Sequence, residues 1–209
     1  MKHFTKDELL NKGKSFNRDF VNCLSGYKSL NLVGTINEET SETNLATFSQ
    51  VFHIGANPPT VGILFRPHTV ERHTLENILQ NGYFTLNHVT ESFYKAAHQC
   101  SARWDQSEFK ATGLKEEYLN NFKAPFVKES PLKIACLLKD KITLSANETI
   151  LIIGSIEEVW VAPQAVEEEG FIALDKLGTI TVSGLDSYHT VNKLARLAYA
   201  KPFKPTKEI

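Results

Sequence analysis

Strand-like stretches of moderate length follow one another along most of this 209-residue chain, and helical stretches separate only some of them. The clearest lies at residues 60–65, where Val61-Gly62-Ile63-Leu64-Phe65 is almost wholly apolar and predicts a central strand. Regular alternation of strand and helix, which would favour a parallel sheet, is missing. The pattern predicts a mainly β protein with peripheral helices, built as a small antiparallel barrel.

The other strands follow from apolar runs and alternation. Strands are expected at residues 30–36, 45–54, 83–89, 132–138 and 149–161, with a turn near 145–147 between the last two. Along 45–54 the Phe48 and Phe52 side is expected to face the core, and the Thr47 and Ser49 side to face ligand or solvent.

Helices are expected at residues 5–24, 74–80, 93–103 and 187–199. Thr5 with Glu8 three residues later forms a capping-box pattern at the first of them. Thr74 is the expected N-cap of the second, which Asn81-Gly82 would end. Apolar residues at 191, 194, 195 and 198 are expected on the inner face of the last helix.

The length predicts one domain over residues 1–209, with two domains as the less favoured alternative. An N-terminal helix is expected within residues 1–26 and a loosely held tail at 200–209. The formal net charge of -1 gives no global argument for nucleic acid or an anionic membrane as a partner. Any anion site must therefore be local.

Three cysteines, Cys23, Cys100 and Cys136, lie far apart, so neither a disulfide framework nor a zinc site is predicted. Free thiols in a reducing compartment are the expectation. The first residues lack the continuous apolar core of a signal peptide, and no apolar run approaches the ~20 residues that span a bilayer. We expect a cytoplasmic protein.

Common catalytic signatures are missing: there is no GxSxG, HExxH, P-loop or GxGxxG pattern. The seven histidines show no metal-ligand spacing, so no metal site and no catalytic side chain is predicted.

The strongest polar cluster is formed by Arg66, Arg72, His73 and Thr74. Two guanidinium groups, an imidazole and a hydroxyl at the start of a helix can hold a phosphate. The alternative is a solvated charged turn beside Pro67.

A second candidate segment lies at residues 43–46, where a loop leads into a strand. Its backbone N–H and C=O groups could match the edge of a planar heterocycle such as an isoalloxazine ring. The alternative is an ordinary junction in which Asn44 makes a turn.

Taken together, these pieces resemble the flavin reductase-like, FMN-binding split-barrel family, which includes the flavoredoxins. The resemblance covers roughly residues 16 to 195 and is carried by the order and spacing of several short segments. These are Phe16-Asn17-Arg18, Leu32-Val33-Gly34-Thr35, residues 44–49, Asn57-Pro58-Pro59, Phe65-Arg66-Pro67, residues 72–78, residues 82–87, Ser107-Glu108-Phe109 with Gly113-Leu114, Glu129-Ser130-Pro131 and residues 152–156.

The resemblance implies a split β-barrel of Greek-key type, working as a homodimer with FMN near the subunit interface. It implies an NAD(P)H-dependent flavin reductase, with FAD not excluded as the flavin and NADH or NADPH as the donor. An electron-acceptor protein or monooxygenase component is a possible partner. By the resemblance, the isoalloxazine and ribityl parts would lie along Thr43, Asn44, Leu45, Ala46, Thr47 and Ser49, and the phosphate would be held by Arg66, Arg72, His73 and Thr74.

The chain departs from the family pattern at two positions. Thr47 stands where the family often has proline. Threonine has a backbone N–H and a hydroxyl that proline lacks. His73 stands where aspartate is common; if His73 is protonated beside the phosphate, cofactor affinity would fall as pH rises.

Residues 184–189 loosely resemble a C-terminal Gly-x-x-x-Tyr segment that lies near the nicotinamide in some relatives. Tyr188 or His189 would then contact the nicotinamide; the alternative is a loop leading into the last helix.

Two other functions share these sequence features. One is a non-enzymatic electron carrier that holds FMN and passes electrons to a protein partner. The other is a β-barrel binding module that has lost flavin. For hydride transfer the cofactor supplies the redox chemistry, so missing catalytic side chains are expected.

Overall fold

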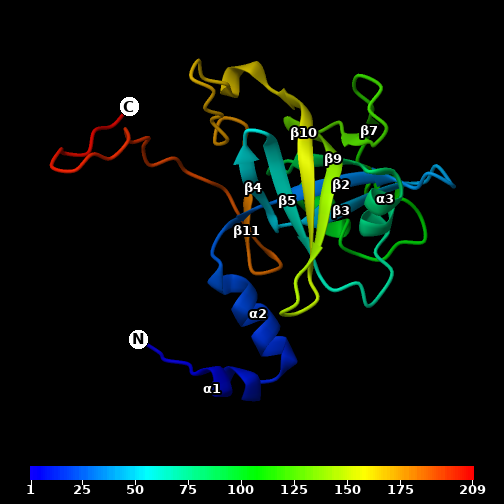
Figure 1. The fold of residues 1–209 in the computed structure, drawn as a ribbon, viewed down its shortest axis with the longest axis horizontal. Helices are drawn as coiled ribbons and strands as arrows, with labels where there is room; N and C mark the ends of the chain where they lie inside the picture. Colours follow the sequence, from blue (N-terminus) through cyan, green and yellow to red (C-terminus); the bar gives the residue numbers. More distant parts are fainter.

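A seven-stranded antiparallel sheet runs through the body of the computed structural model, which describes residues 1–209 (Figure 1). In order across the sheet, its strands are β3 (Thr43–Phe48), β2 (Asn31–Ile36), β6 (Tyr83–His88), β9 (Leu132–Thr143), β10 (Ile150–Val161), β5 (Pro59–Phe65) and β4 (Val51–Ala56).

The two edge strands of this sheet, β3 and β4, are consecutive in the chain, and only Ser49 and Gln50 separate them. Seven strands laid flat would set the edges roughly 29 Å apart, whereas this link reaches roughly 11 Å. The sheet is therefore rolled until its edges approach each other. The Phe48 and Phe65 rings meet there, with centroids 4.8 Å apart.

Smaller elements surround the sheet. The helices are α1 (Lys6–Asn11), α2 (Lys14–Leu24), α3 (His73–Asn81), α4 (Tyr94–Gln99), α5 (Glu108–Thr112) and the 3-10 helix η1 (Pro163–Ala165). The remaining strands form a sheet of β1 (Lys28–Ser29), β11 (Thr181–Ser183) and β12 (Ser187–His189), and a pair of β7 (Glu116–Glu117) and β8 (Phe126–Val127). No helix has the length and apolar character needed to cross a membrane.

Two apolar clusters form most of the core. One joins the strands to α3, whose Leu75 and Ile78 are fully buried. The other packs Leu45 of β3 against α4, α5 and β11. Burying a side chain such as Leu75 contributes about 1.5–3 kcal/mol, so α3 is fixed firmly on the sheet.

Several expectations for the strands are confirmed. The strand at 60–65 is β5, which pairs with a neighbour on each side, and the turn at 145–147 joins β9 to β10. The prediction of a single strand at 45–54 is wrong. Ser49 and Gln50 separate two strands, β3 and β4, which form the two edges of the rolled sheet. The assigned core face is also wrong in part: Leu45 is fully buried, while Phe52 on the edge strand β4 is exposed.

The expected single N-terminal helix within residues 1–26 is two helices. The capping box of Thr5 and Glu8 is confirmed at α1, but Gly13 takes a φ of 90° and separates α1 from α2. Neither helix buries a residue in the body; Phe16 and Phe20 instead stack with ring centroids 5.4 Å apart. Figure 1 shows both helices projecting away from the sheet.

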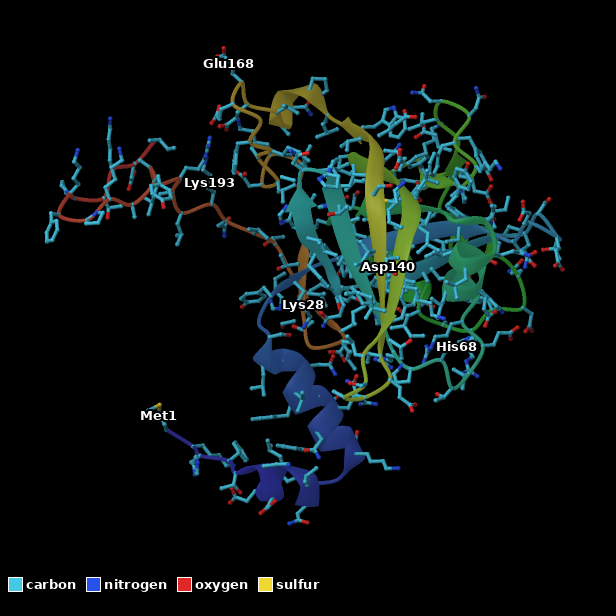
Figure 2. The ribbon with its side chains drawn as sticks, in the orientation of Figure 1. Met1, Lys28, His68, Asp140, Glu168 and Lys193 are labelled. Atoms are coloured by element: carbon cyan, nitrogen blue, oxygen red, sulfur yellow. The ribbon has the colours of Figure 1, made fainter.

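The expected helices after α3 are corrected at three places. The helix expected at 93–103 is the shorter α4, and α5 and β7 lie in a part of the chain for which no helix or strand is expected from the sequence. The terminal helix at 187–199 is wrong: β12 occupies its start and no helix follows. Leu194 is fully exposed, and Figure 2 shows Lys193 on a segment clear of the sheet. An amphipathic pattern alone rarely holds a helix without a surface to pack on.

Candidate functional site

A cavity of about 480 Å³ opens between the free side of β3, the start of α3, the segment after α4 and the β11–β12 hairpin. Eight of the ten residues expected from the sequence line it: Asn44, Ala46, Thr47, Ser49, Arg66, Arg72, His73 and Thr74. The two parts of the expected site, one at the start of a strand and one at the start of a helix, therefore meet in space.

A buried polar network joins these two parts. Asn44 donates from Nδ2 to the Thr74 hydroxyl at 2.9 Å and to the Thr35 hydroxyl at 3.3 Å. Asn77 also donates to Thr35, at 3.1 Å. All four residues are at most 8% exposed, so these bonds hold β3, β2 and α3 in a fixed relation.

Thr74 is the second residue of α3, and the expectation that it caps the helix is wrong. Arg72 is the N-cap, and no side chain caps the first-turn N–H groups. The Thr74 hydroxyl bonds to Asn44 instead. An uncapped helix start leaves backbone donors and the positive end of the helix dipole available to an anion.

Two guanidinium groups line the cavity near this helix start, and neither forms an ion pair. Arg72 is half-buried and donates from Nε and Nη2 to the Pro67 carbonyl at 3.2 and 3.1 Å. Arg66 is exposed and makes no hydrogen bond through its side chain. Their positive charge is left without a carboxylate partner.

The Arg72 backbone is fixed by Glu76, whose Oε1 accepts from the Arg72 N–H at 3.0 Å and contacts His68 Nε2 at 2.8 Å. Burial opposes ionisation of this carboxyl, but the Arg72 N–H and His68 outweigh it and lower the pKa of Glu76. The ionised carboxylate holds the turn that carries the Arg72 guanidinium.

The β3 wall depends on residues to which the sequence assigned no role. Glu108 at the start of α5 accepts the Leu45 N–H at 2.9 Å. Thr47 donates from its hydroxyl to the Ala97 carbonyl of α4. The Leu45 side chain lies wholly in the core, so only its backbone is near the cavity. The segment Ser107-Glu108-Phe109 was the one sequence signal for Glu108.

The side of the cavity formed by the β11–β12 hairpin and the end of α4 contains Tyr188, Leu185 and Cys100. Burial raises the pKa of the Cys100 thiol to about 12, so it stays protonated near neutral pH and is no nucleophile. Of the two candidates at the C-terminal segment, only Tyr188 reaches the cavity. His189 packs on Tyr27, with ring centroids 4.8 Å apart, and bonds to Ser183 at 2.9 Å.

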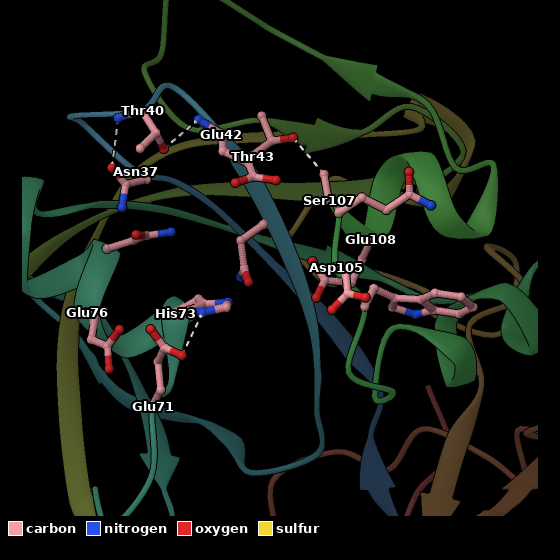
Figure 3. A pocket seen from close by; sticks show the side chains of 14 residues that line it. Asn37, Thr40, Glu42, Thr43, Glu71, His73, Glu76, Asp105, Ser107 and Glu108 are labelled. Atoms are coloured by element: carbon pink, nitrogen blue, oxygen red, sulfur yellow. Dashed lines mark hydrogen bonds and ion pairs between the residues drawn. The ribbon is translucent and has the colours of Figure 1, made fainter.

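A second cavity, of about 370 Å³, adjoins the first and shares Asn44, Glu71, His73 and Glu108 with it. Figure 3 shows five carboxylate side chains around it: Glu42, Glu71, Glu76, Asp105 and Glu108. Thr43 lines this cavity rather than the first, and bonds to Ser107 at 2.8 Å. His73 Nε2 lies 3.5 Å from a Glu71 oxygen. No group of three or more His, Cys, Asp or Glu residues is arranged to hold a metal.

One protein family and several solved structures match this chain over most of its length. The family described as "flavin reductase like domain" matches residues 26–180. A proposed flavin reductase with a split barrel domain from Shewanella frigidimarina NCIMB 400 is 48% identical, with a TM-score of 0.92 over 96% of this chain and 100% of that one.

More distant structures share the fold. Nitrilotriacetate monooxygenase component B from Bacillus cereus is 22% identical, with a TM-score of 0.81 over 94% of this chain and 98% of that one. Flavoredoxin of Desulfovibrio vulgaris (Miyazaki F) is 23% identical, with a TM-score of 0.69 over 85% and 92%. None of the curated proteins matches the chain.

Proposed function

The chain belongs to the flavin reductase-like family, and from that membership we propose that it is an FMN-binding oxidoreductase that works as an NAD(P)H-dependent flavin reductase. The observation that carries the proposal is one cavity that holds an uncapped helix start, two unpaired guanidinium groups and the free edge of β3. Its volume of about 480 Å³ is typical of cofactor sites.

The phosphate end is assigned to Arg66, Arg72, His73 and Thr74. A phosphate dianion needs several donors and positive charge, and the N–H groups at the start of α3 supply donors beside both guanidinium groups. Because these charges lack carboxylate partners, no internal ion pair has to break when the phosphate binds.

The ring end is assigned to the segment from Thr43 to Ser49. β3 is an edge strand, so the backbone groups on its outer side have no strand partner. Glu108 accepts a hydrogen bond from the Leu45 N–H. The Thr47 N–H, two residues later, points toward the same outer edge of β3. That edge can donate to the pyrimidine side of a flavin.

When bound, FMN would supply the redox chemistry, accepting two electrons from NADH or NADPH and passing them to an acceptor. The residues of this chain would bind and orient it; none has to act as an acid or base. Tyr188 is the residue assigned to contact the nicotinamide.

We further propose that the rolled sheet is a split barrel of Greek-key type, that residues 1–209 form one domain and that the protein is a homodimer. Exposed apolar side chains on the projecting segments support the dimer, among them Leu24, Leu194 and Phe203. One structural relative is component B of a monooxygenase, which supports another component of such a system as the electron-accepting partner of this chain.

The second candidate function is an electron carrier that holds FMN and reduces a protein partner. The same residues would bind the flavin, and a flavoredoxin is among the structural relatives. The two functions differ in whether a nicotinamide nucleotide can reduce the flavin.

The deciding experiment is the visible spectrum of the purified protein, loaded with FMN if necessary, followed by anaerobic addition of NADH and then NADPH. Bleaching by either nucleotide supports the reductase and identifies the donor. A flavin spectrum that neither nucleotide bleaches favours the carrier. A colourless protein that fails to bind added FMN overturns both.

A further inference from the structure

Tyr188, which lines the first cavity, is paired with a histidine of α4 that lies outside it. His98, on the exposed side of α4, has its Nδ1 atom 2.5 Å from the Tyr188 hydroxyl. The Tyr94 ring, one helical turn earlier, lies 5.5 Å from the Tyr188 ring. The phenol ring is therefore held from one side by packing and at its tip by an imidazole.

The helix that carries His98 also holds the opposite wall of the cavity. The Ala97 carbonyl accepts the Thr47 hydroxyl of β3, and the next residue, His98, bonds to Tyr188 of β12. Two adjacent residues of α4 thus connect the proposed ring-binding strand with the Tyr188 side chain in the cavity wall. A ligand between β3 and Tyr188 would meet walls whose separation α4 sets.

The tautomer of His98 decides which atom donates in the His98–Tyr188 bond. Burial and the nearby Asp186 raise the pKa of the Tyr188 hydroxyl, so the phenol is protonated at neutral pH and can donate to an unprotonated Nδ1. The imidazole then carries its own proton on Nε2. With its only proton engaged, the phenol oxygen presents lone pairs, which accept an N–H donor.

We propose that His98 is a positioning residue for Tyr188, and that the phenol oxygen it orients accepts a hydrogen bond from the carboxamide N–H of the nicotinamide donor. This role rests on the proposed function. It extends the site to a residue of α4 that does not line the cavity and would act only through Tyr188.

The first test requires no turnover. Long-range ¹H–¹⁵N NMR of the flavin-loaded protein should show the His98 ring as the Nε2–H tautomer, and the Tyr188→Phe variant should lose that preference. A predominant Nδ1–H tautomer in the wild type would overturn the proposal.

The second test measures ligand binding and catalysis in His98→Ala, Tyr188→Phe, the double variant and His98→Asn, which keeps an acceptor near the Nδ1 position. Loss of one oriented hydrogen bond should raise the Kd for NAD+ or NADP+, read by flavin fluorescence, about fivefold. KM for the donor should rise by the same factor, and in His98→Ala, whose residue lies outside the cavity lining, FMN affinity should stay within about twofold of wild type. His98→Asn should stay within about twofold of wild type.

The double variant should be no worse than either single variant, because both remove one interaction. Additive losses, or a His98→Ala protein that binds the nucleotide like wild type, would overturn the role of His98. The exposed β4 residue His53 provides a matched control, and His53→Ala should change nothing. If neither nucleotide binds to or reduces the wild-type protein, the proposed function fails and the role of His98 fails with it. If the wild-type protein is reduced normally and His98→Ala behaves like it, only the role of His98 fails.

Discussion

Asn44 at the start of β3 donates a hydrogen bond of 2.9 Å to the hydroxyl of Thr74, thirty residues later at the start of α3. Both residues are buried, and the bond crosses from the proposed ring-binding segment to the proposed phosphate-binding segment. The relative position of the two ends of the proposed flavin site therefore depends on this buried hydrogen bond and on the bond that Asn44 also donates to the Thr35 hydroxyl.

Replacing Thr74 with valine should destabilise the protein and weaken FMN binding together. Valine keeps the shape but removes the acceptor, which leaves the Asn44 amide with only Thr35, at 3.3 Å. We expect the free energy of unfolding in urea to fall by about 1–2 kcal/mol. Thr74→Ser, which keeps the hydroxyl, should retain most of both properties; equal stability of the valine variant and wild type would contradict the structural role of this bond.

Replacing Arg66 with alanine should weaken FMN binding without changing stability. Its side chain makes no hydrogen bond or ion pair, so nothing in the folded chain depends on it. Loss of a charge-assisted contact to the phosphate should raise the Kd for FMN about tenfold or more, measured by fluorescence titration.

Riboflavin, which lacks the phosphate, is the matched ligand for this test. Its Kd should be the same for wild type and Arg66→Ala. The exposed Lys141 on β9 lies outside the cavity, so Lys141→Ala controls for loss of one positive charge. A parallel loss of riboflavin binding would show that Arg66 does not act on the phosphate.

Local sequence patterns predict the parts of this molecule that depend on near neighbours. The apolar run at 60–65 forms β5, and the capping pair Thr5 and Glu8 starts α1. The helix after Arg72 is also found, one residue earlier than expected. In each case the deciding interactions lie within a few residues along the chain.

The remaining features depend on contacts between distant residues. Glu108 accepts the N–H of Leu45, 63 residues away, and no local pattern specifies that partner. The break between β3 and β4 follows from the rolling of the whole sheet. Leu194 has a helical spacing of apolar neighbours but no surface in its own chain to cover it, which explains the wrong terminal helix.

The carboxylates of the second cavity predict a preference for FMN over FAD. FMN and FAD carry about the same total negative charge, but the second phosphate of FAD would place part of it beyond the phosphate site, where Glu71 lines both cavities and Asp105 lines the acidic one. Repulsion between exposed like charges is modest and screened by salt, so we expect the ratio of the two Kd values to be severalfold and to shrink at high salt.

The combined variant Glu71→Gln with Asp105→Asn should reduce this ratio. The matched control is Glu38→Gln with Glu39→Gln, which removes the same charge from two exposed residues of the adjoining loop that do not line the cavity. If both double variants change the ratio equally, the effect reflects net charge and not the carboxylates of the cavity.

The ring of His88 predicts a loss of stability in mild acid. This half-buried side chain on β6 has no hydrogen-bond partner, and burial lowers its pKa from 6.5 to about 4. Between these values the unfolded chain binds a proton that the folded chain does not, so stability falls as pH decreases from about 6.5 toward 4. From pH 7.5 to pH 5 the expected loss of folding free energy is at most about 2 kcal/mol.

Urea unfolding across this pH range measures the loss caused by His88. His88→Gln should flatten the pH dependence of the unfolding free energy, whereas replacing the exposed His53 in the same way should leave it unchanged. A His88→Gln protein that keeps the wild-type slope would assign the acid sensitivity to other groups.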